Sequence, residues 1–257
     1  MYVEDARVLD DKSKKAFLSE VKIWARLAHP HTLRLFGACL DTSRPFMVSE
    51  YCKFGNICEY LARISSPPRS LLVRMVDDVA SGMAYLHRNR IIHGDLKGAN
   101  ILVSNDHRAL LADFGISKVL DEDFTTRSHQ SRTGSLRGTL RWMAPECLYG
   151  DSRVTMASDI YSFAMTAWEI YSGQVPFADI SERVLAIAVV EQKRRPKCPA
   201  RLTGQGSIWT LIQSCWDARP SVRPDFENIR IVTKRLSSNK SGEYVGAKNI
   251  HLGINSC

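Results

Sequence analysis

The sequence predicts one α+β domain, in which a small part with a sheet precedes a larger, mainly helical part. The chain has 257 residues, a length that can bury a sizeable single core. The clearest strand-like stretches are confined to residues 32–51, whereas apolar residues recur at helical spacing along most of the chain after them. A cleft between two such parts is a common ligand site, and we expect the functional residues there.

Composition and cysteine usage indicate a globular, cytoplasmic protein. Apolar residues make up 44% of the chain and charged residues 24%. The longest apolar run, Val184–Val190, is far shorter than the roughly 20 residues that a membrane-spanning helix needs. Met1–Lys15 lacks the apolar core of a signal peptide. The 7 cysteines include no Cys-x-x-Cys pair, which indicates reduced thiols rather than a disulfide framework.

The formal net charge is +8, and a basic surface attracts phosphates, acidic peptides or nucleic acid. No basic run is interleaved with aromatic residues in the manner of a nucleic-acid binder. The 7 histidines also fall at no spacing that is typical of metal ligands. We therefore interpret the excess of lysine and arginine as an ordinary solvated surface and expect no nucleic-acid partner.

The small part should begin with a helix from about Lys12 to Ala28. Its apolar residues Phe17, Val21 and Trp24 repeat at helical spacing, and the pair His29-Pro30 ends it. Two strand-like stretches follow at residues 32–40 and 45–51, and residues 41–44 form a turn-like connection between them.

The larger part should consist mainly of helices, at residues 57–64, 157–171, 180–192, 208–216 and 224–236. One more long helix has an apolar face formed by Leu72, Val76, Val79, Met83 and Leu86. The helix at 157–171 is apolar at nearly every position, which predicts burial on all sides. Residues 91–114 are typical of short strands and loops. The long polar stretch 114–144 has no clear period, and such a stretch inside a compact domain is usually functional or disordered.

Two short motifs supply residues for phosphoryl transfer. The first is the run from His93 to Asn100, and the second is Asp113-Phe114-Gly115. Phosphoryl transfer needs metal ions to offset phosphate charge, a carboxylate that orients the attacking hydroxyl, and a nearby cation. Asp95 is the candidate base and Lys97 the candidate cation. Asn100 and Asp113 offer the hard oxygen ligands that Mg²⁺ prefers.

Together with Ala144-Pro145-Glu146, these motifs follow the order of the signature set of eukaryotic protein kinases, and the chain resembles that family over residues 1–236. The resemblance implies a two-lobe fold, ATP and Mg²⁺ as cofactors, and protein substrates. Residues 1–52 would form a partial N-lobe, with the family's helix C and its fourth and fifth strands. Residues 53–236 would form the mainly helical C-lobe, and residues 237–257 a loose polar tail.

The resemblance also implies a nucleotide site. Glu20 falls where kinases carry the helix-C glutamate that pairs with an ATP-contacting lysine, although a lone helix glutamate is usually a surface residue. The remaining residues of this implied site are Ser49 as the gatekeeper, Glu50 and Cys52 whose backbone would meet adenine, and Leu102 and Ala112 as apolar walls. For Leu102 and Ala112, ordinary core packing is a serious alternative.

Further roles are implied in the C-lobe. Thr139 resembles the threonine whose hydroxyl contacts the catalytic aspartate and lysine. Asp159 resembles the buried carboxylate that anchors the catalytic loop, and a charge within an apolar helix should be paired or hydrogen-bonded. The resemblance also implies a structural ion pair and an apolar stack between the lobes, formed by Glu146 with Arg223 and by Trp24, Leu35, His93 and Phe114.

The kind of kinase is indicated by smaller features. Lys97, two residues after Asp95, resembles serine/threonine kinases. The run Leu140–Met143 and the pair Cys215-Trp216 resemble the tyrosine-kinase-like group. Gly94 stands where most kinases have an arginine that pairs with a phosphorylated activation loop. We therefore predict weak dependence on that pairing, although phosphorylation could still pair locally with nearby arginines at Thr125, Thr126, Ser128, Ser131, Thr133 or Ser135.

The sequence contains no G-x-G-x-x-G motif and no candidate for the lysine that grips the α- and β-phosphates in kinases. The expected sheet is one strand pair, which is marginal in water and has an exposed edge. Three interpretations follow. The chain is an N-terminally truncated form of an active serine/threonine kinase, a pseudokinase that acts as a binding or scaffold module, or a basic nucleic-acid-binding protein. We favour the first, because Asp95, Asn100 and Asp113 are all present.

Overall fold

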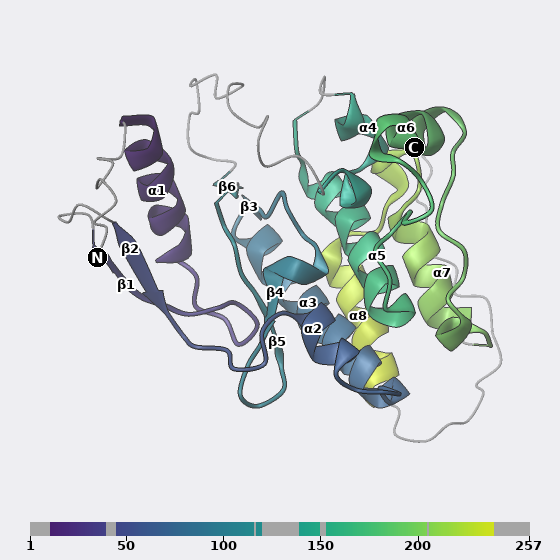
Figure 1. The fold of residues 1–257 in the computed structure, drawn as a ribbon, viewed down its shortest axis with the longest axis horizontal. Helices are drawn as coiled ribbons and strands as arrows, with labels where there is room; N and C mark the ends of the chain where they lie inside the picture. The colour runs from purple at the N-terminus through teal and green to yellow at the C-terminus, as the bar shows by residue number, and fades with distance from the viewer. Residues whose placement is uncertain are drawn as a thin grey trace, which may run out of the picture.

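The computed structural model describes residues 11–39, 45–115, 117–119, 139–149, 153–204 and 206–238. A small part with one helix and a two-stranded sheet lies beside a larger helical part (Figure 1). This arrangement confirms the α+β class and the order of the two parts that the sequence predicts.

The small part consists of α1 (Asp11–Trp24) and the antiparallel strands β1 (Leu35–Cys39) and β2 (Phe46–Ser49). The predicted helix ends earlier than Ala28, because the amide of Arg26 bonds to the Ile23 carbonyl and tightens the last turn. The first predicted strand also starts later than Thr32, because Thr32 forms an isolated bridge with Leu111 in the larger part. The bridge between Thr32 and Leu111 joins the small part to the large one.

The larger part begins with α2 (Ile57–Ala62) and α3 (Arg69–Arg88). Asn56 starts α2 through a capping box with Glu59, in which each side chain accepts from the other residue's amide. One face of α3 is buried along its whole length, as the apolar spacing predicts. The following segment forms short strands in two antiparallel pairs, β3 (Ile91–Ile92) with β6 (Lys118–Val119) and β4 (Ile101–Val103) with β5 (Ala109–Leu111).

The remaining elements are helical. They are η1 (Gly98–Asn100), η2 (Leu140–Trp142), α4 (Pro145–Leu148), α5 (Met156–Ser172), α6 (Glu182–Ala186), η3 (Ile187–Glu191), η4 (Ala200–Leu202), α7 (Gly206–Cys215), η5 (Pro220–Val222) and α8 (Phe226–Ser238). All four helices expected after residue 156 are present. The predicted tail from residue 237 begins inside α8, and residues 239–257 lie outside the described residues.

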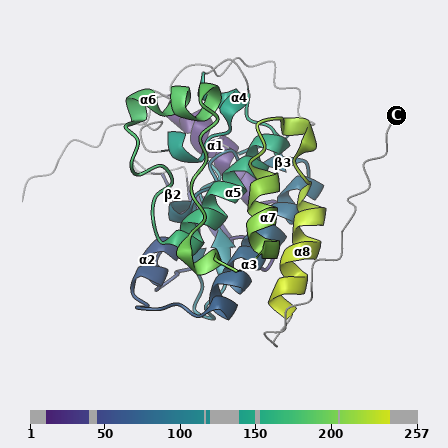
Figure 2. The ribbon, with the colours of Figure 1, turned by 90° about the vertical axis from the view of Figure 1, so that its right-hand side faces the viewer.

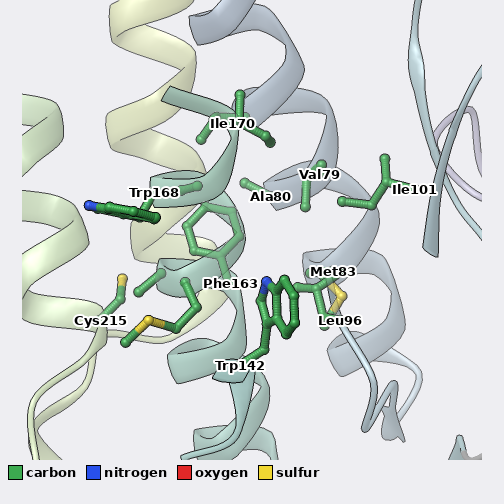
Figure 3. Close-up of a cluster of buried hydrophobic side chains, with 14 of the residues drawn as sticks. Val79, Ala80, Met83, Leu96, Ile101, Trp142, Phe163, Trp168, Ile170 and Cys215 are labelled. Atoms are coloured by element: carbon green, nitrogen blue, oxygen red, sulfur yellow. The ribbon is translucent and has the colours of Figure 1, made fainter. Parts of the chain in front are cut away.

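The core surrounds α5, which is buried from Ser158 to Tyr171 apart from the half-buried Ser162. Side chains of α3, α5 and the segment before α4 gather there, with Phe163 near the centre (Figure 3). Helix α8 packs against α3, and α7 packs against α5 (Figure 2). The prediction that the helix at residues 157–171, which is α5, is buried on all sides is confirmed. Within the described part of the chain, no helix is both long and apolar enough to cross a membrane.

Candidate active site

The residues from His93 to Asn100, here called the 93–100 loop, connect β3 with β4 and end in η1. Asp159 of α5 holds the start of this loop. Its carboxylate, 1% exposed, accepts from the backbone amides of His93 and Gly94, both at 2.9 Å. The ring Nε2 of His87 lies 2.9 Å from the same carboxylate. The anchoring contact implied for Asp159 is present.

Asp95 lies at the centre of a hydrogen-bonded group within this loop. Lys97 Nζ donates to Asp95 Oδ2 at 2.8 Å and to Thr139 Oγ1 at 2.9 Å. The side-chain amide of Asn100 donates to the same Oδ2 at 3.0 Å and to the Asp95 carbonyl at 2.8 Å. Among the described residues Asp95 Oδ1 is buried and has no hydrogen-bond partner. One carboxylate oxygen is therefore fixed by two donors, and the other has no donor among the described residues.

Asp113 follows β5 and is exposed. Its φ of 60° is in the left-handed region, which few residues other than glycine adopt. The amide of its neighbour Ala112 donates to the Asn100 carbonyl at 2.9 Å, which ties this turn to the 93–100 loop. Because the side-chain nitrogen of Asn100 donates to Asp95, the side-chain oxygen Oδ1 of Asn100 is left as a ligand atom. Asn100 and Asp113 thus offer an amide oxygen and a carboxylate from two connected loops.

Phe114 is fully buried and lies between two other aromatic rings. Its ring centroid is 5.9 Å from that of Trp24 in α1 and 5.6 Å from that of His93. Leu35 is half-buried and packs against the same core. His93 Nε2 bonds to the Ala112 carbonyl at 3.2 Å, and burial lowers the pKa of this imidazole. The apolar stack between the two parts is present for these three rings.

Glu20 of α1 points toward the turn at Asp113–Gly115. A Cβ built on Gly115 would lie 3.3 Å from Glu20 Oε2 and 3.3 Å from Asp113 Oδ1. Burial, with a smaller contribution from Asp113, raises the pKa of Glu20. Within the described part of the chain no lysine or arginine lies within ion-pair distance of Glu20. Its environment therefore favours a cationic neighbour.

The residues of the implied adenine site lie in or directly after β2, in β4, and directly after β5. Glu50 follows β2, and its amide donates to the Arg34 carbonyl at 3.2 Å, so only its carbonyl remains for a ligand. The carbonyl of Cys52 accepts from the Gly55 amide at 3.1 Å, which leaves the Cys52 amide for this role. Ser49 and Leu102 are half-buried, and Ala112 is buried. Asn56 bridges to Leu102, so the segment after β2 runs beside β4.

Glu146 and Arg223 form a bidentate ion pair. The two guanidinium nitrogens of Arg223 lie 2.7 and 2.8 Å from the two Glu146 oxygens. Arg223 is 7% exposed and also donates to the Ala157 and Asp217 carbonyls. The ion pair joins α4 to the segment before α8, as the resemblance implies.

Comparison with known proteins decides the family. The model for "Protein tyrosine and serine/threonine kinase" matches residues 6–232. The chain belongs to this protein kinase family. It is 36% identical over 228 residues to the serine/threonine/tyrosine-protein kinase HT1 of Arabidopsis thaliana. It is 36% identical over 222 residues to human serine/threonine-protein kinase TNNI3K, and 33% over 230 residues to human receptor-interacting serine/threonine-protein kinase 1.

These alignments cover 87%, 83% and 84% of the chain but 55%, 25% and 33% of the three relatives. The chain thus spans about half the length of the plant kinase and less of the human ones. These relatives support a tyrosine-kinase-like kinase domain of the serine/threonine type. They give no support to the interpretation as a pseudokinase.

Two side chains of this kinase domain that sequence reasoning missed also contact the 93–100 loop or its anchor. Glu169 of α5 accepts from the Gly98 amide at 2.9 Å, and His87 of α3 lies against Asp159. Glu169 carried a usable signal, because it is a charged residue in an otherwise apolar helix, as Asp159 is. His87 carried none. The six predicted phosphorylation positions between residues 125 and 135 lie outside the described residues.

Proposed function

We propose that this kinase domain transfers the γ-phosphoryl group of ATP to serine and threonine hydroxyls of proteins. The observation that carries the proposal is the state of the Asp95 carboxylate. Lys97 and Asn100 hold its Oδ2, whereas its buried Oδ1 has no partner among the described residues. A base that accepts a substrate proton needs such an oriented and unoccupied oxygen.

Lys97 and Thr139 complete the arrangement. Lys97 Nζ bridges Asp95 and the Thr139 hydroxyl, so its charge is held within a few ångströms of the proposed base. A fixed cation at this point stabilises negative charge that develops on the transferring group. The bridge also fixes the segment before α4 relative to the 93–100 loop. These contacts support the serine/threonine type.

The described residues fit a divalent cation. Asn100 Oδ1 and the exposed Asp113 carboxylate are hard oxygen ligands from two loops joined by a backbone hydrogen bond. No group of three or more His, Cys, Asp or Glu side chains in the described residues forms a metal cage, and Mg²⁺ typically uses one or two carboxylates with substrate phosphates. When bound, Mg²⁺ offsets the charge of the phosphates.

The nucleotide would lie between the two parts of the domain. We assign adenine to the backbone of Glu50 and Cys52 beside Ser49, with Leu102 and Ala112 as the apolar walls. Glu20 would meet a cation near the phosphates. In this proposal residues 1–52 belong to the N-lobe, 53–236 form the C-lobe, and 237–257 form a polar tail. Cys39, Cys52, Cys58, Cys198 and Cys215 are free thiols, which supports a cytoplasmic location.

The test is phosphoryl transfer from labelled ATP to a mixed protein substrate, with the full chain and Mg²⁺. Asp95→Asn should lower kcat by about 100-fold or more, because a positioned base contributes roughly 10²–10⁴-fold. Asp113→Asn should weaken Mg·ATP binding, whereas Asp95→Asn should leave it unchanged. Asp106→Asn, at an exposed turn between β4 and β5, is the matched control. Absence of transfer by the unmodified chain, or equal activity of the Asp95 and Asp106 variants, would refute the proposal.

A further inference from the structure

Glu169 of α5 is a buried carboxylate, 6% exposed, and it meets three separate segments of the chain. Its Oε2 accepts from the Gly98 amide of the 93–100 loop and from the Trp142 indole, both at 2.9 Å. Its Oε1 accepts from the Cys58 thiol of α2 at 3.3 Å. Helix α2 therefore takes part, through this thiol, in a contact that also joins α5 to the 93–100 loop and to η2.

Burial of Glu169 makes each of these donors consequential. A carboxylate that leaves water needs hydrogen bonds or an opposite charge. No lysine or arginine in the described residues lies within ion-pair distance of Glu169. Burial raises its pKa, and the hydrogen bonds from Gly98, Cys58 and Trp142, together with the charge of Lys97, act against that rise. Loss of the thiol donor should therefore loosen the whole contact.

The backbone of the loop approaches Cys58 and Glu169 very closely at Gly98. A Cβ added to Gly98 would overlap with the Cys58 sulfur and would lie 2.9 Å from Glu169 Oε2. The Cys58 sulfur ends a short side chain, and Glu169 Oε2 is held by the Gly98 amide and the Trp142 indole, so neither atom moves aside without losing contacts. Cys58 and Gly98 are therefore sterically matched, since the thiol fills the space that the missing side chain leaves.

We propose that Cys58 is a positioning residue for phosphoryl transfer, acting through Glu169 and Gly98 on Lys97. The thiol holds the Glu169 carboxylate against the Gly98 amide and closes the space above Gly98. The peptide that joins Lys97 to Gly98 is then fixed, and Lys97 Nζ is kept on Asp95 and Thr139. This inference rests on the proposed function. It concerns kcat, because Cys58 and Glu169 lie outside the proposed nucleotide contacts.

The experiment measures kcat and the KM for ATP in four test variants and one control variant of the full chain. Cys58→Ala should lower kcat about fivefold with an unchanged KM, as expected for the loss of one modest hydrogen bond. Cys58→Ser should retain most of the activity, because its hydroxyl can donate to Glu169. Gly98→Ala should lower kcat further. The double variant Cys58→Ala/Gly98→Ala should have a higher kcat than Gly98→Ala alone, because removal of the thiol makes room for the added Cβ. Cys198→Ala, at an exposed cysteine, is the matched control.

The positioning role is wrong if Cys58→Ala has the kcat of Cys198→Ala and if Gly98→Ala has the same effect with and without the thiol. Hydrogen exchange at the Gly98 amide provides a readout that needs no activity. This amide should exchange faster in Cys58→Ala than in Cys198→Ala. If the unmodified chain transfers no phosphoryl group but the exchange differs, only the proposed function is overturned. Equal exchange rates overturn the role of Cys58 in either case.

Discussion

Replacement of Asp159 by alanine should be among the most damaging single changes in this domain. The carboxylate is 1% exposed and accepts hydrogen bonds from the His93 and Gly94 amides at 2.9 Å each. Alanine would leave the buried amide of His93 and the part-buried amide of Gly94 without an acceptor. The ring of His87 would lose its partner as well.

The magnitude follows from these contacts. A buried donor without a partner costs roughly 1–3 kcal/mol, so two amides give about 4 kcal/mol. That loss is a large part of the 5–15 kcal/mol by which a typical domain is stable. Asp159→Asn should be milder, at about 2 kcal/mol, because its amide oxygen can still accept from one of the two backbone groups.

Urea unfolding of the full chain measures this difference, with Asp106→Ala at an exposed turn as the control. We expect a lower unfolding midpoint with an unchanged m-value, which indicates a loss of stability rather than a change in compactness. The kcat should fall as well, since the same amides begin the 93–100 loop. An unfolding free energy of Asp159→Ala within about 0.5 kcal/mol of the control would refute the anchoring argument.

Three further predictions use the same unfolding measurement. Arg223→Met should lower the unfolding free energy by about 3 kcal/mol, because it leaves Glu146 without its partner, and Glu146→Gln in the same chain should recover part of the loss. Gly94 has φ +80°, so Gly94→Ala should lower the unfolding free energy by about 1 kcal/mol. Gly206→Ala, which has open space around it, should not lower it, and equal effects of the two substitutions would contradict the prediction. Burial, with smaller contributions from His31, Arg88 and Arg230, lowers the pKa of His29 to about 4. The unfolded chain therefore binds a proton that the folded chain excludes, and stability should fall as the pH drops from about 6.5 to about 4. Partial hydration limits this contribution to about 1 kcal/mol, and the pH profile of His29→Gln should lack it.

Motif reasoning could predict which residues lie close together where their contacts depend on local sequence. The spacing from Asp95 to Asn100 is short, so both side chains belong to one loop, and their mutual hydrogen bond follows from that closeness. Asp159 could be predicted as an anchor because an unpaired charge is costly inside an apolar helix. Helix α5 itself was clear from its composition, since a helix that is apolar on all sides has to lie in a core.

Contacts between distant segments could not be predicted in the same way. Cys58 meets Glu169 across 111 positions of sequence, and no periodicity relates the two residues. The early start of the predicted first strand was wrong for a similar reason. Thr32 has β-forming character, but the backbone at this point bonds to Leu111 of the larger part rather than to β2. Periodicity describes which face of an element is buried and leaves open which neighbour buries it.

The two buried carboxylates of α5 together explain how the 93–100 loop keeps its shape. Asp159 and Glu169 are separated by about 15 Å along the helix, from a rise of about 1.5 Å per residue. They accept hydrogen bonds from the amides of Gly94 and Gly98. Between them, the hydroxyl of Thr166 donates to the Leu96 carbonyl at 3.3 Å. The loop is therefore held against α5 at both ends and at its middle. These contacts hold the segment that carries Asp95 and Lys97, so a change at either carboxylate should disturb both residues.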